Sequence, residues 1–128
     1  KKRDYTVVPN CIFTDPEIGS VGYTEDAARQ KGYEVKIGRF PFMALGKAHA
    51  LGETEGFVKL VGDAKTQQIL GGQILGPHAT DLIAEVAVAM KLESTMAELE
   101  ETIHAHPTLS EGIMEAAGNF YGRAIHVP

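Results

Sequence analysis

Two stretches rich in β-branched and large apolar residues, 57–61 and 69–75, lie close together in the chain and constrain its fold more than any other feature. The segment between them, 62–68, contains Gly and Asp, which favour turns. Two strand-forming runs joined by a short turn predict a β-hairpin. Gly71 and Gly72 weaken the second strand, so we expect either a bulge or another element that crosses closely there.

Three further segments have the pattern of strands. Residues 7–13 are predicted to be extended and interrupted at Pro9, and residues 18–23 alternate and include two glycines. The segment 15–17 between them, Asp-Pro-Glu, has turn chemistry, so the two short strands should be neighbours. Residues 33–40 alternate apolar and polar side chains with the period of a half-buried strand.

Capping residues and helical spacing predict four helices. They are expected between the caps Thr24 and Gly32, from His78 or Thr80 to Met90, over 96–100 after Ser94 or Thr95, and over 113–121. Because residues 84–89 are nearly all small or β-branched, we expect the second helix to be buried on most of its circumference, between the sheet and a partner surface. Leu99 and Ile103 are expected in the core.

This pattern predicts a single α+β domain over residues 1–128. Strands joined by hairpin-length connections favour a mostly antiparallel four- to five-stranded sheet with helices packed around it. A chain of 128 residues with 44% apolar residues is large enough for a core of its own. Residues 41–55 are predicted to form a loop, whose apolar content indicates that it packs against another surface.

Charge and cysteine content bear on the class of function. A net charge of -5 without a cationic stripe argues against a nucleic-acid partner, and no apolar run reaches membrane-spanning length. Cys11 is the only cysteine, which excludes an internal disulfide. It is more simply a small buried residue than a reactive thiol, and it fits a reducing compartment such as the cytoplasm, or the mitochondrial matrix of a eukaryote. No charged-then-apolar leader follows Lys1, so we expect no targeting segment.

The segment 101–111, Glu-Thr-Ile-His-Ala-His-Pro-Thr-Leu-Ser-Glu, concentrates the groups suited to chemistry. An imidazole exchanges a proton near neutrality, and a hydrogen-bonded carboxylate fixes its tautomer and stabilises its charged form. His106 and Glu111 are therefore the candidate catalytic pair. Pro107 disfavours an α conformation at His106 and makes a cis peptide accessible, so His106 should lie at a turn, and a helix can start at Thr108.

Structural interpretations of the same residues stay open. Thr108 and Glu111 also fit a capping box, in which Glu111 would serve only the start of a helix. His104 and His106 have the types of metal ligands, but a third ligand at standard spacing is missing, so we predict no metal site. The acidic cluster within 98–101 is more simply a solvated face than a cation site.

The motif His-Ala-His-Pro-Thr-Leu-Ser-Glu, residues 104–111, resembles the carboxy-terminal signature of the pyridine nucleotide-disulfide oxidoreductases. Residues 11–22, 48–59 and 69–79 are similar to segments of that family's dimerisation domain, in the same order. The resemblance covers nearly the whole chain. It is closest to the members that oxidise dihydrolipoamide, whereas relatives acting on other disulfides share the His-Pro-Thr core.

The resemblance implies an active site that is completed by a homodimer. FAD, NAD and a redox-active cysteine pair would belong to preceding domains, which are absent from this chain, and the chain has no Gly-x-Gly-x-x-Gly motif of its own. His106 would act as acid/base toward a dihydrolipoamide thiol, and Glu111 would hold its ring. The His106-Pro107 peptide would be cis, and His106 and Pro107 would approach the partner's FAD.

Further expectations and alternatives follow from the same resemblance. The isolated fragment is expected to be inactive, and the complete enzyme to bind the acyltransferase component of a 2-oxoacid dehydrogenase complex. One alternative is the same domain of a reductase for another disulfide, of the glutathione type, which would keep His106 and Glu111. The other is a purely structural dimerisation module. A tail without a cysteine pair argues against relatives that carry a second redox pair there.

Overall fold

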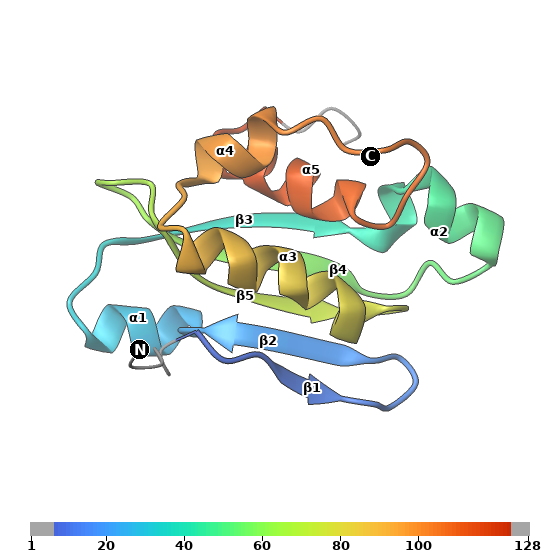
Figure 1. Cartoon of the computed structure of the whole chain (residues 1–128), viewed down its shortest axis with the longest axis horizontal. Helices are drawn as coiled ribbons and strands as arrows, with labels where there is room; N and C mark the ends of the chain where they lie inside the picture. The colour runs from blue at the N-terminus through green and yellow to red at the C-terminus, as the bar shows by residue number, and fades with distance from the viewer. Residues whose placement is uncertain (1–6, 124–128) are drawn as a thin grey trace.

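The computed structural model describes residues 7–123 and shows a five-stranded sheet with helices packed on it (Figure 1). All neighbouring strands are antiparallel, in the order β1-β2-β5-β4-β3. The strands are β1 (Asn10–Ile12), β2 (Ile18–Gly22), β3 (Val35–Pro41), β4 (Phe57–Asp63) and β5 (Ile69–Leu75). The predicted α+β class, the central hairpin and the pairing of the first two strands are confirmed.

The β4-β5 hairpin carries the irregularity that its glycines predict. The register of the two strands shifts between Val61 and Gly62. A Cβ atom at Gly71 would lie 2.1 Å from a backbone oxygen, and one at Gly72 would lie 3.0 Å from Cγ1 of Val86. Both expectations, a bulge and a close crossing of another element, are therefore met at this point.

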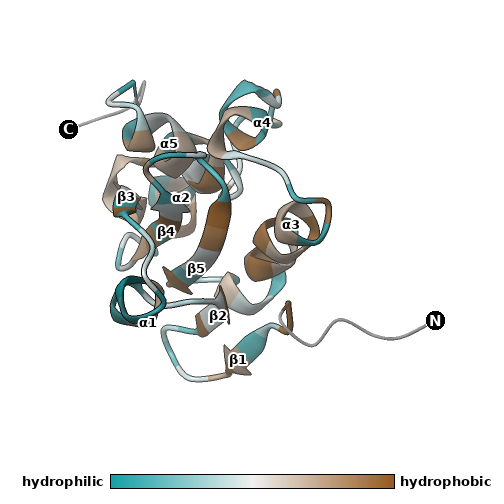
Figure 2. Cartoon of the chain, turned by 90° about the vertical axis from the view of Figure 1, so that its left-hand side faces the viewer, coloured by the Kyte–Doolittle hydropathy of each residue, from teal (hydrophilic) through white to brown (hydrophobic). Residues whose placement is uncertain are grey.

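Within residues 7–123, five α-helices and one 3-10 turn complete the fold. They are α1 (Glu25–Gln30), the 3-10 turn η1 (Phe42–Ala44), α2 (Gly46–Leu51), α3 (Ala79–Lys91), α4 (Met96–Glu101) and α5 (Glu111–Phe120). Helices α3 and α5 pack on the sheet, and α4 packs on α5 (Figures 1 and 2). The core between them includes Val58, Leu60, Ile74, Ile83, Val86, Ile113 and Phe120. A smaller cluster joins Ala28 of α1 to Val61 and Leu70.

Local side-chain contacts explain where two of the short helices begin. The hydroxyl of Thr24 accepts the backbone N–H of Ala27 at 3.1 Å, which confirms the predicted cap of α1. At the start of α4, Thr95 donates its backbone N–H to the carboxylate of Glu98 at 2.7 Å. This contact belongs to a capping box that fixes the first turn of α4.

The prediction of a loop over residues 41–55 is wrong. The segment forms η1 and α2, and Phe42, Leu45 and Ala48 are buried in the chain's own core. Phe42 lies in η1 and Ala48 in α2, and Leu45 is the extended residue that joins the two. The apolar content of this segment is therefore explained mainly by the fold of a single chain.

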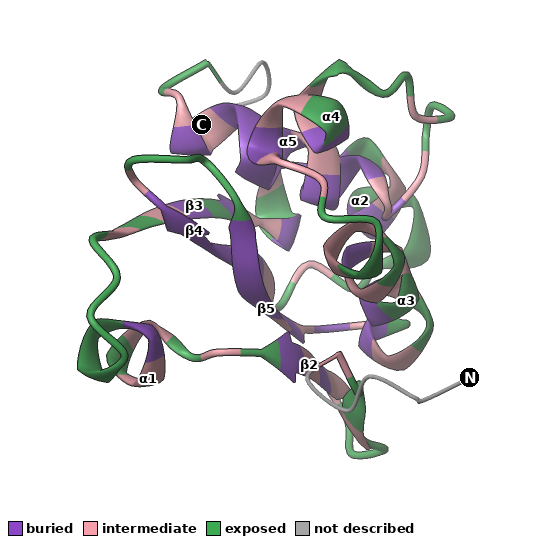
Figure 3. Cartoon of the chain, turned by 60° about the vertical axis from the view of Figure 1, so that its left-hand side comes forward, coloured by how far each residue is buried: buried purple, intermediate pink, exposed green. Residues whose placement is uncertain are grey.

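Of two burial predictions, one stays open and one is wrong. In the single chain, α3 carries buried, half-buried and exposed residues (Figure 3). Ala79, Ile83 and Val86 are buried and Val88 is 58% exposed, so burial of the rest of this helix against a partner surface stays a prediction. The expectation that Ile103 lies in the core is wrong. Ile103 is 95% exposed because it lies beyond the end of α4, on the segment that leads to α5. Within the described part of the chain, no helix is long and apolar enough to span a membrane.

Candidate functional site

The candidate site lies on the segment 102–110, between α4 and α5, where residues 105–107 are exposed. The His106-Pro107 peptide is cis, as the resemblance implies. The His106 side chain is 70% exposed, whereas that of Glu111, at the first position of α5, is only 9% exposed. The segment therefore presents an accessible imidazole next to a largely buried carboxylate.

His106 and Glu111 are in direct contact. Nδ1 of His106 lies 3.0 Å from Oε1 and 3.0 Å from Oε2 of Glu111. Because a carboxylate can only accept, Nδ1 carries the proton and donates it. Nε2 is then the ring nitrogen that remains for proton exchange with another molecule. This arrangement can orient an imidazole and stabilise its protonated form.

Glu111 also has the structural duty that the sequence left open. Its Oε1 accepts the backbone N–H of Thr108 at 2.9 Å, and the hydroxyl of Thr108 donates to the carbonyl of Ala105 at 2.7 Å. The helix starts at Glu111, with Ser110 as N-cap, so a start at Thr108 is wrong. Thr108 instead closes a turn before α5 through its hydrogen bonds to Ala105 and to the Glu111 side chain.

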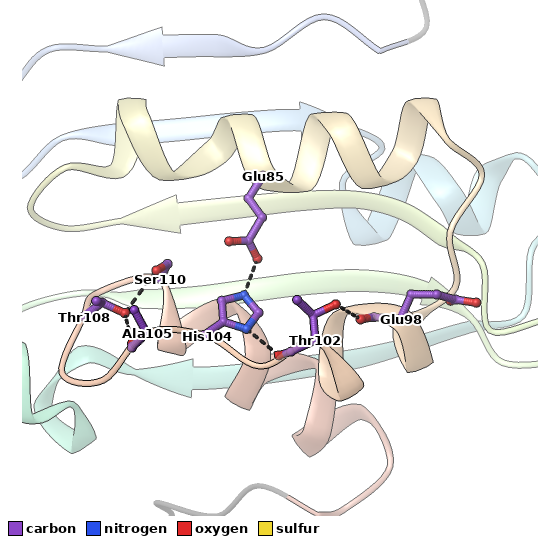
Figure 4. A network of polar contacts seen from close by, with 7 residues as sticks. All are labelled: Glu85, Glu98, Thr102, His104, Ala105, Thr108 and Ser110. Carbon is purple, nitrogen blue, oxygen red and sulfur yellow. Dashed lines mark hydrogen bonds and ion pairs between the residues drawn. The ribbon is translucent and has the colours of Figure 1, made fainter.

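His104 has hydrogen-bond partners that its place in the sequence does not indicate. Its side chain is only 7% exposed, and Nε2 lies 2.8 Å from Oε2 of Glu85 on α3 (Figure 4). Its other ring nitrogen, Nδ1, lies 2.8 Å from the carbonyl oxygen of Thr102. Glu85 precedes His104 by 19 residues, and no spacing rule connects the two positions. His104 and His106 therefore do not act as a pair, because His104 contacts Glu85 and His106 contacts Glu111.

Two of the three acidic residues of α4 accept hydrogen bonds. Glu98 accepts from its neighbour Thr95, and Glu100 accepts from the side chain of Arg123, 23 residues away, at 2.9 Å. The hydrogen bond from Arg123 is the main cause that lowers the pKa of the Glu100 carboxyl. Among residues 7–123, no group of three or more His, Cys, Asp or Glu side chains is arranged to hold a metal ion.

Three large apolar side chains are exposed on α3, at its C-cap and on the segment that carries the candidate site. Val88, Leu92 and Ile103 are 58%, 72% and 95% exposed. Val88 follows Glu85 by three residues on α3, and Leu92 is the C-cap of that helix. His104, which contacts Glu85, is next to Ile103 in the chain. Large apolar side chains exposed together typically mark an interaction surface. We call Val88, Leu92 and Ile103 the apolar surface.

Comparison with known protein families identifies the class to which this sheet topology and the His106-Glu111 contact belong. Residues 8–117 match the family described as the pyridine nucleotide-disulphide oxidoreductase dimerisation domain. The chain belongs to this family. The family expected from the sequence motifs is therefore confirmed.

The most similar relatives include dihydrolipoyl dehydrogenases. The protein of Bacillus subtilis is 55% identical over 123 residues, which are 96% of this chain and 26% of the relative. That of Thermus scotoductus is 51% identical over 120 residues, 94% of this chain and 26% of the relative. The chain thus spans about a quarter of the length of these curated relatives.

Two solved structures share the fold. LpdA from Mycobacterium tuberculosis superposes with a TM-score of 0.86 at 29% identity, over 93% of this chain and 26% of that chain. The HOCl-induced flavoprotein disulfide reductase RclA from Escherichia coli gives 0.81 at 30% identity, over 84% and 25%. The likeness therefore covers most of this chain and one part of each larger protein.

Proposed function

We propose that this chain is the dimerisation domain of a dihydrolipoamide dehydrogenase, which oxidises dihydrolipoamide to lipoamide with NAD. In a homodimer, His106 and Glu111 form the acid/base pair supplied to the partner's active site. The observation that carries this proposal is the 3.0 Å contact of Glu111 with His106 on an exposed segment. The dihydrolipoyl dehydrogenases that match 94% or more of this chain support the choice of substrate.

The chemical duty of His106 follows from the reactivity of thiols. A free thiol has a pKa of about 8.5 and is mostly protonated at neutral pH, but only its thiolate is a strong nucleophile. Nε2 of His106 takes the proton of one dihydrolipoamide thiol, and Glu111 stabilises the resulting imidazolium. The thiolate bonds to one sulfur of the partner's redox disulfide and displaces the other. The second substrate thiol then displaces the first sulfur, which closes lipoamide and leaves the cysteines reduced.

The cofactors belong to domains expected to precede this one. FAD and NAD bound there would supply the electron acceptors that return the cysteine pair to its disulfide form. In this chain, His106 and Pro107 would lie against the partner's FAD. Both residues are exposed, which fits a contact with another surface. The chain has no Gly-x-Gly-x-x-Gly motif, which fits nucleotide binding elsewhere in the enzyme.

The apolar surface supports the homodimer. Ile103 lies on the segment that carries His106, and Val88 and Leu92 lie on α3 and at its C-cap, the helix whose Glu85 contacts His104. A two-fold contact through these side chains would bring His106 to the partner. Within a 2-oxoacid dehydrogenase complex, the acyltransferase's subunit-binding domain would be the further protein partner. The location would be the cytoplasm, or the mitochondrial matrix in a eukaryote. These last two assignments rest on family resemblance.

The test uses the full-length enzyme with His106→Gln. Loss of a positioned acid/base group should lower kcat for dihydrolipoamide oxidation about 10²- to 10⁴-fold. The matched control is His78→Asn, because His78 is exposed and has a φ of 59° that Asn tolerates. Near-normal activity of His106→Gln would reject the role. A wild-type enzyme that prefers glutathione disulfide would favour the other reductase class, and one without bound flavin would favour a structural module.

A further inference from the structure

Each ring nitrogen of His104 faces a hydrogen-bond acceptor (Figure 4). Nδ1 lies 2.8 Å from the carbonyl oxygen of Thr102, and Nε2 lies 2.8 Å from the carboxylate of Glu85. A carbonyl and a carboxylate oxygen can only accept, so each requires an N–H from the ring. A neutral imidazole has one N–H, whereas an imidazolium has two. Both contacts are therefore made together by the charged ring.

The surroundings of His104 fit this charge. Its side chain is 7% exposed, and a charge in such a place is stable only when it is paired and hydrogen-bonded. Glu85 supplies the opposite charge, and Thr102 satisfies the second N–H. The Glu85 side chain is 32% exposed, so water still solvates its carboxylate. A ring with two N–H groups would therefore have an acceptor for each of them.

The contact fastens an otherwise exposed segment to a helix that is packed on the sheet. On either side of His104, residues 103 and 105–107 are exposed. Glu85 belongs to α3, where the next residue, Val86, is fully buried. The contact therefore ties the chain to a rigid support two residues before His106.

We propose that Glu85 and a buried imidazolium of His104 form a positioning ion pair, which holds residues 102–107 on α3 and sets the place of His106. This inference rests on the proposed acid/base function of His106. His104 is too buried to exchange protons with a substrate, so the pair acts through the backbone that it orients. A displacement of about 1 Å in a catalytic group can cost about 10²-fold in rate, so losing the pair should slow the reaction.

The charge on His104 is tested directly by nuclear magnetic resonance. The chain has its own core, so its histidine ring nitrogens can be observed in the 128-residue protein with ¹⁵N-labelled histidine. At pH 7 both nitrogens of His104 should be protonated, and His104→Gln assigns the signals. In Glu85→Gln the ring should show the shifts of a neutral tautomer. A neutral His104 ring in the wild-type chain would overturn the proposal.

The positioning role is tested in the full-length enzyme. Glu85→Gln and His104→Gln should each lower kcat about tenfold or more, and the double variant should lose no more than either single variant, because both remove one contact. Asp81→Asn is the control, since it removes an exposed carboxylate from the same helix. Unchanged rates, or losses that add in the double variant, would overturn the proposal.

His106→Gln in the same enzyme separates this inference from the function on which it rests. If His106→Gln is nearly inactive while Glu85→Gln and His104→Gln have normal rates, only the positioning role fails. If His106→Gln is itself active, the proposed function fails. The NMR result stands apart from both, because it reports the charge on His104 without any turnover.

Discussion

The imidazole Nδ1 of His106 lies 3.0 Å from each carboxylate oxygen of Glu111, and that carboxylate also accepts the N–H of Thr108 at 2.9 Å. One largely buried side chain therefore orients the exposed ring and closes the turn before α5. The two duties depend on different properties of Glu111. Stabilising an imidazolium needs the negative charge, whereas the turn needs only an acceptor oxygen.

Two substitutions at Glu111 should separate these duties. Glu111→Gln keeps an acceptor for Thr108 but removes the charge, so we expect the full-length enzyme to lose at least about tenfold in kcat with little loss of stability. Glu111→Ala also removes the acceptor, which should lower the free energy of unfolding by about a further 1 kcal/mol. Steady-state kinetics and urea unfolding measure the two effects. Full activity in Glu111→Gln would leave the residue with only its structural role in the turn before α5.

The parts of the fold that the sequence predicted are those with local causes. The hairpin follows from two strand-forming runs and a short turn, and the first turns of α1 and α4 follow from Thr24 and Thr95. The position of His106 at a turn follows from Pro107, because proline restricts the residue before it. Structural features that depend on residues close together in the chain can therefore be predicted from the sequence pattern.

The parts that the sequence did not predict depend on distant contacts. Phe42 lies in a 3-10 turn of three residues, which is too short for a helical period to be recognised, and Leu45 lies in the junction that follows it. Only the fold shows that both residues reach the core. Ile103 is expected in the core because it is apolar, but it is exposed in the single chain. The contact of Glu85 with His104 depends on how α3 sits beside the later segment, which no residue spacing encodes.

Gly38 should be intolerant of a side chain because α5 crosses β3 at this point. A Cβ atom there would lie 2.1 Å from the carbonyl oxygen of Ala116 and 3.0 Å from Cβ of Phe120. We expect Gly38→Ala to lower the free energy of unfolding by about 1–3 kcal/mol, as overpacking does. Gly46→Ala is the matched control, since its Cβ would meet nothing within 4 Å. Equal urea midpoints for both variants would contradict the close packing of α5 on β3.

The cap of α4 should make stability depend on pH. The hydroxyl of Thr95, followed by backbone hydrogen bonds, holds the pKa of the Glu98 carboxyl below its ordinary value of 4.5. A carboxyl whose pKa is lower in the folded chain stabilises the fold above the unfolded pKa, and this contribution is lost as pH falls through the folded pKa. Thr95→Ala should therefore cost about 1 kcal/mol at pH 7, and the difference from wild type should shrink near pH 3.

Urea unfolding at the two pH values measures this difference. Ser94→Ala is the control, because it removes the neighbouring hydroxyl but leaves the N-cap of α4 intact. The cap would be unimportant if Thr95→Ala and Ser94→Ala had the same midpoint at pH 7. A difference between Thr95→Ala and wild type that grew toward pH 3 would contradict the assigned pKa direction.

The apolar surface should set the strength of the homodimer. Ile103 is 95% exposed in the single chain and lies between Thr102 and His104 on the segment that carries the candidate site. A two-fold contact would bury this side chain, so Ile103→Glu would place a charge without a partner in the interface. We expect sedimentation of the full-length enzyme to show a shift from dimer toward monomer. Activity should fall in parallel, because a monomer cannot present His106 to a partner.

Gln30→Glu provides a control with the same new side chain on α1, which packs against the separate cluster of Val61 and Leu70. This variant should remain dimeric and active. If Ile103→Glu were as dimeric as Gln30→Glu, the apolar surface would not be the subunit contact. If Ile103→Glu were monomeric but fully active, His106 would work within its own subunit, and the site would not be shared between two chains.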